Sequence, residues 1–368
     1  MKKLLFIRYK KPDGILEGGE QATKNSYTIL SKLLGEENIT TYYVHDGTAK
    51  KNLFTYLSAG LLLFKNYFYG LTPKRVKMIV KEAQNYDYVF IDRSVFGIIA
   101  KQLKEAGYKG QIISFFHNIE SLYFGAKLKK HLPWRPILLH NVDMNDRYAC
   151  LYSDKVIVFN QRDNRELEIR YQRKADVVIP IALKDKCLKK NCNTDVTSTK
   201  PLCLFLGTYF LPNNEGIKWF IDNVYPFVDI DLIIVGKGMG KFKQENNVDE
   251  SIQIFSNVPE LEPFFEKADI MILPIFKGGG MKVKTCEALM YGKNILGTTE
   301  TFEGYDVDYD CVGGLCNTKE EFIEKINDFI QNPRPKFNTY SREQFLEKYS
   351  EEAVVDKFRQ VLSLHAPQ

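Results

Sequence analysis

Residues 274–289 read Pro-Ile-Phe-Lys-Gly-Gly-Gly-Met-Lys-Val-Lys-Thr-Cys-Glu-Ala-Leu, and this stretch decides how the second half of the chain is interpreted. An apolar strand ending at Leu273 runs into three glycines and then into a helix. Glycines let a ligand approach the backbone closely, and a helix start offers unpaired amides and the positive end of a dipole. Lys282 and Lys284 add positive charge beside these amides. The segment therefore predicts a phosphate-binding turn between a strand and a helix.

Lys284 and Glu287 are three residues apart, so we expect them on one face of this helix. In one interpretation Lys284 neutralises a diphosphate and Glu287 accepts hydrogen bonds from ribose hydroxyls. In the other they are a surface ion pair that contributes roughly 0.2–0.5 kcal/mol. The order glycine, lysine, glutamate at a strand-to-helix junction favours the first interpretation.

Strands alternate with helices on both sides of this turn, which predicts an α/β fold of two Rossmann-like, doubly wound domains. The expected strands lie at residues 3–8, 40–44, 88–91, 111–116, 155–159, 201–206, 231–235, 252–255, 270–273 and 294–297. A polar stretch at 184–200 is typical of a linker. We therefore expect an N-terminal domain at 1–183, a C-terminal domain at 201–336 and a terminal helical segment at 337–368. Ser341 to Gln344 match a capping box that would start the last helix.

Composition is that of an ordinary globular protein, with 368 residues, 44% hydrophobic and 26% charged. The apolar run at the N-terminus is shorter than a signal-peptide core, and no later run is long enough to span a bilayer. We expect the protein to stay in the cytoplasm. The seven cysteines form no Cys-x-x-Cys pair, so reduced thiols are expected rather than a zinc site. The net charge of residues 1–180 is +11 and that of 181–368 is −6, which indicates either an anionic partner for the first half or a merely solvated basic surface.

The motifs of the second half, taken in order, resemble the GT-B glycosyltransferases, specifically the large retaining family 4-like group of bacterial sugar transferases (glycosyl transferases group 1). The segments that carry the resemblance are 205–208, 212–216, 235–238, 268–269, 274, 278–289, 292, 298–299 and 303–304. The resemblance covers nearly the whole chain. It implies a cleft between the two domains and a C-terminal helix that crosses back to the first domain.

The resemblance also implies roles for individual residues. In the second domain, the residues expected to bind the donor follow the ends of strands and would contact its diphosphate and ribose. They are Gly207, Thr208, Gly236, Gly279, Gly280, Met281, Lys282, Lys284 and Glu287. In the first domain, Gly18 and Gly19 match the glycine loop that closes over the reacting centre. His117 matches a histidine placed near the transferred sugar. Lys284, His117 and Gly19 are the expected catalytic residues.

The chain departs from the family pattern at two places. Gly279 stands where many relatives carry the first of two glutamates, so the usual partner of the donor sugar is missing. Tyr209 and Phe210 stand where a basic residue is common, and we expect Lys282 and Lys284 to compensate. No metal site is expected: Asp229-Ile230-Asp231 matches Asp-x-Asp but adjoins a strand, as a solvated loop does. No cofactor is expected besides a UDP- or GDP-sugar co-substrate.

The expected function is metal-independent transfer of a hexosyl group from a nucleotide sugar to a glycan or lipid-linked acceptor, with retention implied by the resemblance. Residues 54–69 combine aliphatic, aromatic and lysine side chains, which suits a membrane interface. A buried helix is the alternative for this segment. We expect a role in surface-polysaccharide assembly with peripheral contact at the inner membrane face.

Two other functions remain open from the sequence. One is a non-catalytic GT-B subunit that binds a nucleotide sugar and assists a partner transferase, which Gly279 motivates. The other is a sugar-nucleotide epimerase on the same fold. Nucleic-acid binding is disfavoured because the basic residues accompany no recognisable binding motif.

Overall fold

The computed structural model describes residues 2–11, 18–45, 60–68, 70–128, 131–187, 196 and 200–364. The chain divides into two compact units. Unit 1 holds the first strand, Gly19–Pro180 and the chain from Val354 onward, and unit 2 holds Gly18 and Ile181–Ala353. Most of the polar stretch at 184–200 lies outside the described residues.

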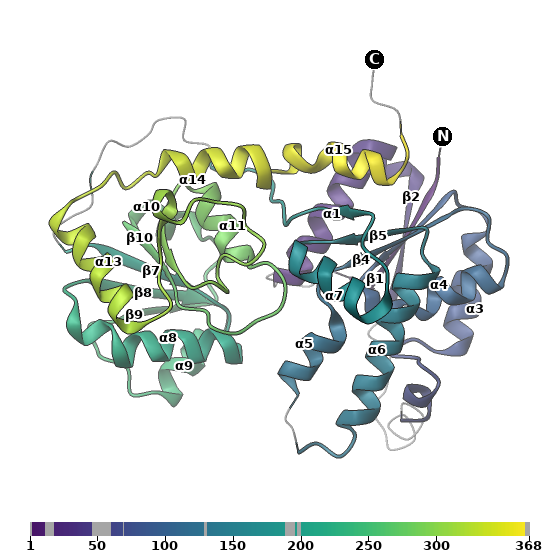
Figure 1. Cartoon of the computed structure of the whole chain (residues 1–368), viewed down its shortest axis with the longest axis horizontal. Helices are drawn as coiled ribbons and strands as arrows, with labels where there is room; N and C mark the ends of the chain where they lie inside the picture. Colours follow the sequence, from purple (N-terminus) through teal and green to yellow (C-terminus); the bar gives the residue numbers. More distant parts are fainter. Residues whose placement is uncertain are drawn as a thin grey trace. The chain divides into compact units, whose positions relative to one another are not determined.

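Unit 1 contains a six-stranded parallel sheet of order β2-β1-β3-β4-β5-β6. Its strands are β1 (Leu4–Lys10), β2 (Ile39–His45), β3 (Tyr88–Asp92), β4 (Gln111–Phe116), β5 (Lys155–Val158) and β6 (Val177–Val178). Helices cover both faces of this sheet (Figure 1): α1 (Gly18–Leu34), α3 (Pro73–Ala83), α4 (Ile98–Glu105), α5 (Glu120–Lys127), α6 (Arg135–Tyr152) and α7 (Gln161–Tyr171). The order reverses between β1 and β3, so the carboxyl ends of these strands border a crevice.

Unit 2 contains a second six-stranded parallel sheet, of order β12-β11-β10-β7-β8-β9. Its strands are β7 (Leu202–Leu206), β8 (Asp231–Gly236), β9 (Gln253–Ser256), β10 (Ile270–Leu273), β11 (Asn294–Gly297) and β12 (Gly313–Leu315). Its helices are α8 (Leu211–Asn223), α9 (Met239–Glu245), α10 (Glu262–Lys267), α11 (Val283–Met290), α12 (Tyr309–Val312), α13 (Lys319–Gln331) and α14 (Thr339–Gln344). The two doubly wound sheets predicted from the sequence are thereby confirmed.

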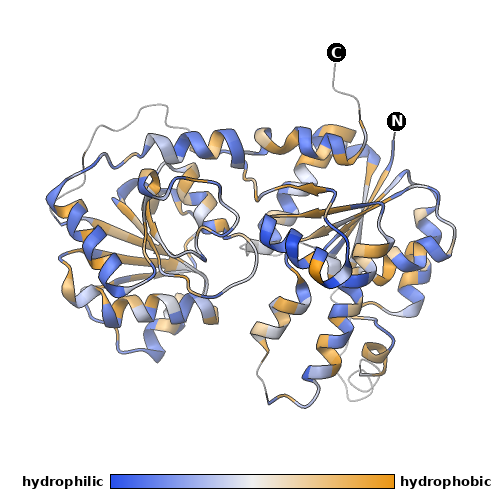
Figure 2. Ribbon diagram, viewed as in Figure 1, coloured by the Kyte–Doolittle hydropathy of each residue, from blue (hydrophilic) through white to orange (hydrophobic). Residues whose placement is uncertain are grey.

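Burial explains why the central strands are continuous apolar runs. The four residues of β10 and the five of β3 are all buried, because helices cover both faces of a parallel sheet. Figure 2 shows this pattern in both units, with strands coloured as hydrophobic and helices that carry one hydrophilic side. Among the described residues, none of the helices combines the length and the apolar character needed to cross a bilayer.

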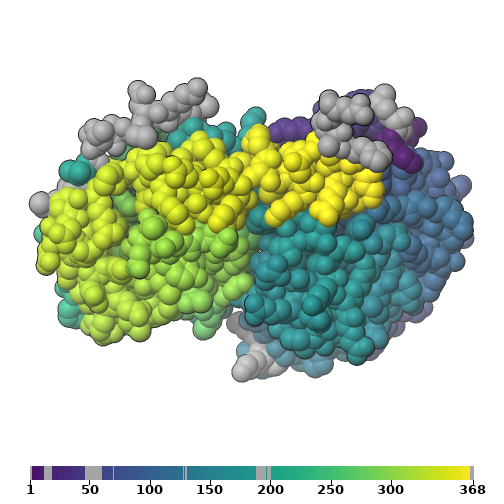
Figure 3. Space-filling model, turned by 45° about the horizontal axis from the view of Figure 1, so that its top comes forward, coloured from purple at the N-terminus to yellow at the C-terminus, as the bar shows by residue number. Residues whose placement is uncertain are grey.

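The C-terminal helix α15 (Glu351–Val361) begins in unit 2 and continues into unit 1. Within unit 1, the Tyr88 hydroxyl donates a hydrogen bond to the Leu362 carbonyl at 2.9 Å, and the rings of Phe115 and Phe358 lie 6.3 Å apart. Figure 3 shows this end of the chain, in yellow, on the surface of unit 1. The predicted return of the terminal helix to the first domain is confirmed.

The predicted capping box at 341–344 is wrong. Asn338 caps α14, because its side chain accepts a hydrogen bond from the Ser341 amide at 2.9 Å. Ser341 lies inside the helix, and its hydroxyl donates to the Lys293 carbonyl. A true capping box stands at the start of α13, where Thr318 and Glu321 satisfy each other's backbone amides.

Candidate functional site

The strand order of unit 2 reverses between β7 and β10, which are neighbours in the sheet. In an open doubly wound sheet, ligands bind in the crevice outside the carboxyl ends of the strands at such a reversal. Helix α8 follows β7 and helix α11 follows β10, so both begin at this edge. The glycine, lysine and glutamate residues of the predicted donor site therefore lie where the topology places a ligand.

Lys284 lies in the first turn of α11 and is held from two directions. Its ammonium donates a hydrogen bond to Asn213 Oδ1 at 2.6 Å and lies 5.2 Å from the centroid of the Phe205 ring. The Asn213 amide in turn donates to the Thr208 carbonyl at 2.9 Å. Asn213 thus ties the loop after β7 to the lysine of α11. Sequence reasoning placed Asn213 within a family motif but gave it no role.

Lys284 and Glu287 both have pKa values shifted toward neutral pH. Burial lowers the pKa of Lys284 to about 7, and the nearby charge of Lys282 acts in the same direction, while Glu287 opposes both. Burial raises the pKa of Glu287 to about 7, against the charges of Lys186 and Lys284. An anionic ligand near Lys284 would favour its charged form. Perturbed groups of this kind in a crevice are typical of functional sites.

Gly207 and Gly236 are required by a close approach of two strand ends. A Cβ atom on Gly236 would lie 1.9 Å from the Gly207 carbonyl oxygen, and a Cβ on Gly207 would lie 2.8 Å from the Phe205 ring. Side chains at either position would therefore displace the loop that carries Thr208. The absence of side chains also leaves the backbone open at this edge, as close binding of a diphosphate requires.

In the glycine turn before α11, two predicted residues also have local structural roles. Gly280 adopts a left-handed φ of 62°, which favours glycine. The buried Met281 side chain accepts a weak hydrogen bond from the Ile181 amide, with 3.4 Å between N and Sδ. Gly279 lies between them and the end of β10. Their contacts with a donor remain predictions.

Lys282 is already engaged by a carboxylate that sequence reasoning missed. Its ammonium lies 2.6 Å from Glu300 Oε1 and 2.7 Å from the Gly280 carbonyl oxygen. Glu300 follows β11, and its Oε1 lies 3.2 Å from the position that a Cβ on Gly278 would take. A carboxylate from a distant part of the sequence thus lies beside the glycine turn. No spacing rule pointed to Glu300, because only the sheet brings it there.

At the carboxyl edge of the sheet in unit 1, a buried hydrogen-bonded set surrounds His117. His117 Nε2 lies 3.0 Å from Asp92 Oδ1, and Thr23 Oγ1 donates to Asp92 Oδ2 at 2.6 Å. Burial alone would raise the pKa of Asp92, but the charge of His117 and the hydrogen bonds from His117 and Thr23 hold it below its ordinary value. Within the described part of the chain, His117 Nδ1 has no partner although it is buried. Gly18 and Gly19 begin α1, the helix that supplies Thr23.

Asp92 and Thr23 were not among the predicted site residues. The signal for Asp92 was its place as the last residue of an apolar strand, since side chains at that edge face the crevice. Thr23 lies one turn after Gly19, and its hydroxyl also contacts the Gly19 carbonyl at 3.1 Å. The structure therefore links Gly19 of the predicted glycine loop to the predicted histidine through Thr23 and Asp92 of unit 1.

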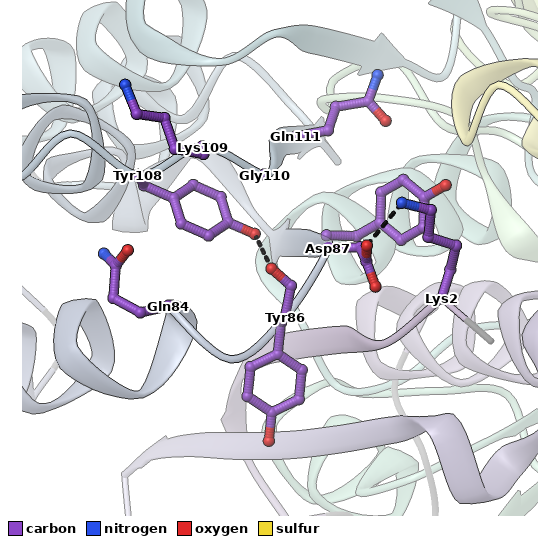
Figure 4. Close-up of a pocket in the computed structure, with 9 residues that line it drawn as sticks. Lys2, Gln84, Tyr86, Asp87, Tyr108, Lys109, Gly110 and Gln111 are labelled. Carbon is purple, nitrogen blue, oxygen red and sulfur yellow. Dashed lines mark hydrogen bonds and ion pairs between the residues drawn. The ribbon is translucent and has the colours of Figure 1, made fainter.

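Two other features are accounted for without a ligand. Lys200 forms ion pairs with Asp229 and Asp231 at 3.8 and 2.9 Å, which accounts for the Asp-x-Asp string. A hollow of about 490 Å³ in unit 1 lies at the amino ends of β3 and β4, the edge opposite to His117 (Figure 4). Its wall includes the ion pair of Lys2 with Asp87, and none of the predicted site residues lines it.

Comparison with known proteins agrees with this geometry. Residues 200–332 match the family model described as glycosyl transferases group 1. The chain is 24% identical over 277 residues to an uncharacterised 44.6 kDa protein in the cps region of Klebsiella pneumoniae, covering 69% of this chain and 68% of that protein.

Two solved structures share the fold over almost their whole lengths. Sucrose-phosphate synthase from Thermosynechococcus elongatus superposes with a TM-score of 0.74 at 12% identity, covering 99% of this chain and 98% of that one. Anabaena HepE, solved with UDP and glucose, superposes with a TM-score of 0.67 at 14% identity, covering 99% and 100%. Residues 200–332 therefore are a glycosyl transferases group 1 domain, and the chain as a whole has the two-domain GT-B fold.

Proposed function

We propose that this protein is a cytoplasmic glycosyltransferase that moves a hexosyl group from a nucleotide sugar to a glycan or lipid-linked acceptor, with retention at the anomeric carbon. The observation that carries the proposal is Lys284, held by Asn213 at the strand-order reversal of unit 2 with its pKa lowered to about 7. The charged form of such a half-buried lysine is stabilised by an anion, and the helix start beside it offers free amides.

In the proposed reaction, the bond between the anomeric carbon and the diphosphate oxygen breaks, and a bond forms from the same carbon to an acceptor hydroxyl oxygen. The hydroxyl proton passes to the leaving phosphate oxygen. Negative charge grows on the diphosphate as the bond breaks, so preorganised donors aimed at it lower the barrier. Lys284 and the backbone near Gly280 take this role, while Glu287 accepts hydrogen bonds from the ribose.

The donor and the context are proposed from the relatives. HepE was solved with UDP-glucose, which makes UDP-hexoses the first donors to test. The Klebsiella protein comes from a cps region, which supports a role in surface-polysaccharide assembly. His117, oriented through Asp92, and the backbone at Gly18 and Gly19 would contact the transferred sugar.

Gly279 and the engaged state of Lys282 favour a second candidate, a non-catalytic GT-B subunit that only binds the donor. Against it stands Glu300, whose carboxylate lies beside the glycine turn and supplies an acceptor for sugar hydroxyls. We therefore place Glu300 at the donor sugar, in the role that a glutamate at position 279 would have.

The test is release of nucleoside diphosphate from a panel of UDP-, GDP- and dTDP-hexoses, without added metal, in the presence and absence of a membrane-lipid extract. Lys284→Ala is the inactive variant. Lys277→Ala is its matched control, because this lysine lies in the same turn but is exposed and paired with Glu215. Release that needs the extract, persists in the control and disappears with Lys284→Ala supports transfer. Binding without release from any donor contradicts it and favours the non-catalytic subunit.

A further inference from the structure

Three segments of unit 1 pack together: residues 60–68, helix α5 and the N-terminal half of helix α6. The Asn141 side chain donates a hydrogen bond to the Leu63 carbonyl at 2.7 Å, and Asn145 donates to the Asn66 carbonyl at 3.0 Å. The rings of Phe68 and Phe124 meet edge to face at 5.6 Å. These contacts fix residues 60–68 to α5 and α6.

Large apolar side chains on these segments remain exposed. Leu61 and Phe64 are 69% and 68% exposed, Trp134 is 46% exposed and Leu122 is 41% exposed. Leu61 and Phe64 are three apart on a helical turn and share a face, while Leu63 between them packs against the cluster around Leu138. Figure 2 shows the short helix that carries them as hydrophobic. We call Leu61, Phe64, Leu122 and Trp134 the apolar patch.

The two stretches of sequence that carry the apolar patch, residues 47–81 and 121–142, contain no acidic residue. Residues 47–81 hold seven lysines and arginines and no aspartate or glutamate, and residues 121–142 hold four and none. The chain as a whole holds 46 acidic residues in 368, so roughly seven would be expected in these 57 positions if they were evenly spread. Lys65 and His131 are exposed beside the patch.

We propose that the apolar patch and its basic surroundings dock this protein on a bilayer surface that contains anionic phospholipids. Aliphatic and aromatic side chains flanked by lysines are the chemistry of an interfacial anchor: the apolar groups enter the boundary below the headgroups and the cations stay among the phosphates. The proposal deepens the proposed function by naming the surface that would bring a lipid-linked acceptor to the enzyme. It does not depend on the transfer reaction.

A bilayer fits these observations better than a protein partner does. Exposed Trp, Phe and Leu on stretches of sequence that contain lysines and no carboxylates suit a surface that is negative outside and apolar beneath. A protein partner would need acidic groups arranged against the lysines, whereas any anionic bilayer offers them. A single such patch gives reversible binding, because each cation near the surface adds little and the inserted apolar area is small.

The test is co-sedimentation of the full chain with phosphatidylcholine vesicles, with and without phosphatidylglycerol. The variant is Leu61→Ser with Phe64→Ser, and its matched control is Ile169→Ser, which removes an apolar side chain that is 75% exposed on α7 of the same unit. We expect binding to the anionic vesicles only, weakened about tenfold or more by the double substitution and unchanged by the control. Both serine variants should keep wild-type nucleotide binding, and Lys284→Ala, which is expected to lose it, should still bind vesicles.

Trp134 gives a second readout, since the chain has only two tryptophans. In a Trp219→Phe background, the emission of Trp134 should shift to the blue on binding to anionic vesicles, because its ring leaves water. No vesicle binding at low salt overturns the proposal. Binding that is abolished by salt but insensitive to the double substitution, with no shift of Trp134, also overturns it, because charge alone would then account for it.

Discussion

The polar groups at the carboxyl edges of the two sheets differ in how their charged forms are stabilised. In unit 1, Asp92 receives hydrogen bonds from His117 and Thr23, and its pKa is held low. In unit 2, Lys284 and Glu287 are both shifted by burial toward their neutral forms, with pKa values of about 7. In the first set both carboxylate oxygens of Asp92 accept hydrogen bonds, whereas in the second the desolvation of Lys284 and Glu287 is a cost that a charged ligand would offset.

This difference assigns different tasks to the two edges. The hydrogen bond to Asp92 holds the His117 ring in one orientation, which suits a residue that must position a sugar. Lys284 and Glu287 are suited to binding, because an arriving diphosphate and ribose would stabilise the charged forms that burial disfavours. The residues after β10 should therefore dominate donor affinity, and those after β3 and β4 should dominate turnover.

The largest effect is expected for Lys284→Ala. Loss of a charge-assisted contact to the diphosphate should weaken nucleotide-sugar binding by about 10–100-fold, since hydrogen bonds to charged groups contribute roughly 1.5–3 kcal/mol. Isothermal titration with UDP-glucose measures the change. His117→Ala is the comparison across the two edges and should leave the affinity for UDP within about threefold of wild type. Equal losses of affinity for UDP in both variants would contradict the proposal that the edge of unit 2 alone dominates donor affinity.

Asp92→Asn should act on turnover instead. The substitution keeps the shape of the side chain but removes the charge that holds His117, and a displaced catalytic group can cost about 100-fold in rate. We expect kcat to fall toward that limit with little change in the affinity for UDP. Thr23→Val, which removes only the hydrogen bond to Asp92 Oδ2, should fall between this variant and wild type. A normal kcat in Asp92→Asn would mean that the buried set only stabilises the fold.

Features that are continuous in the sequence could be predicted from it, whereas features that only the fold assembles could not. Ten strands were predicted because they are apolar runs bounded by turns, but β6 and β12 were not, since edge strands of two and three residues carry no periodicity. The sequence pattern predicts a helix at residues 216–224, whereas α8 begins five residues earlier at Leu211, because Pro212 fits a first helical turn. The glycine turn of unit 2 is continuous in sequence and was predicted. Glu300 and Thr23 were missed, because only the folded sheet brings them to their partners.

Donor affinity should depend on pH through the pair in unit 2. Lys284 binds a diphosphate in its charged form, which is lost as pH rises above about 7, and Glu287 accepts hydrogen bonds best when ionised, which is lost as pH falls below about 7. The affinity for UDP-glucose, whose diphosphate does not titrate near neutrality, should therefore peak near pH 7. It should fall on either side, approaching tenfold per pH unit.

Two substitutions separate the limbs of this profile. Lys284→Met should remove the alkaline limb and Glu287→Gln the acid limb, each with weaker binding at the optimum. Asp92→Asn should leave both limbs in place, since the shift belongs to unit 2. A flat wild-type profile between pH 6 and pH 8 would contradict the charge balance inferred for Lys284 and Glu287.

The smallest changes in stability are expected from substitutions of glycines. One glycine at each edge tests whether the residue is needed for packing or for activity. Gly236→Ala would place a Cβ 1.9 Å from the Gly207 carbonyl oxygen, so the strand end must shift, at a cost of about 1–3 kcal/mol in the free energy of unfolding. Gly19 has nothing within 4 Å of its Cβ position and lies in the first turn of α1, so Gly19→Ala should stabilise the protein by up to about 1 kcal/mol. Denaturant unfolding measures both. If Gly19 closes over the donor as the resemblance implies, the stabilised Gly19→Ala protein should nevertheless lose transfer activity. Full activity together with added stability would show that this glycine serves only as part of the first turn of α1.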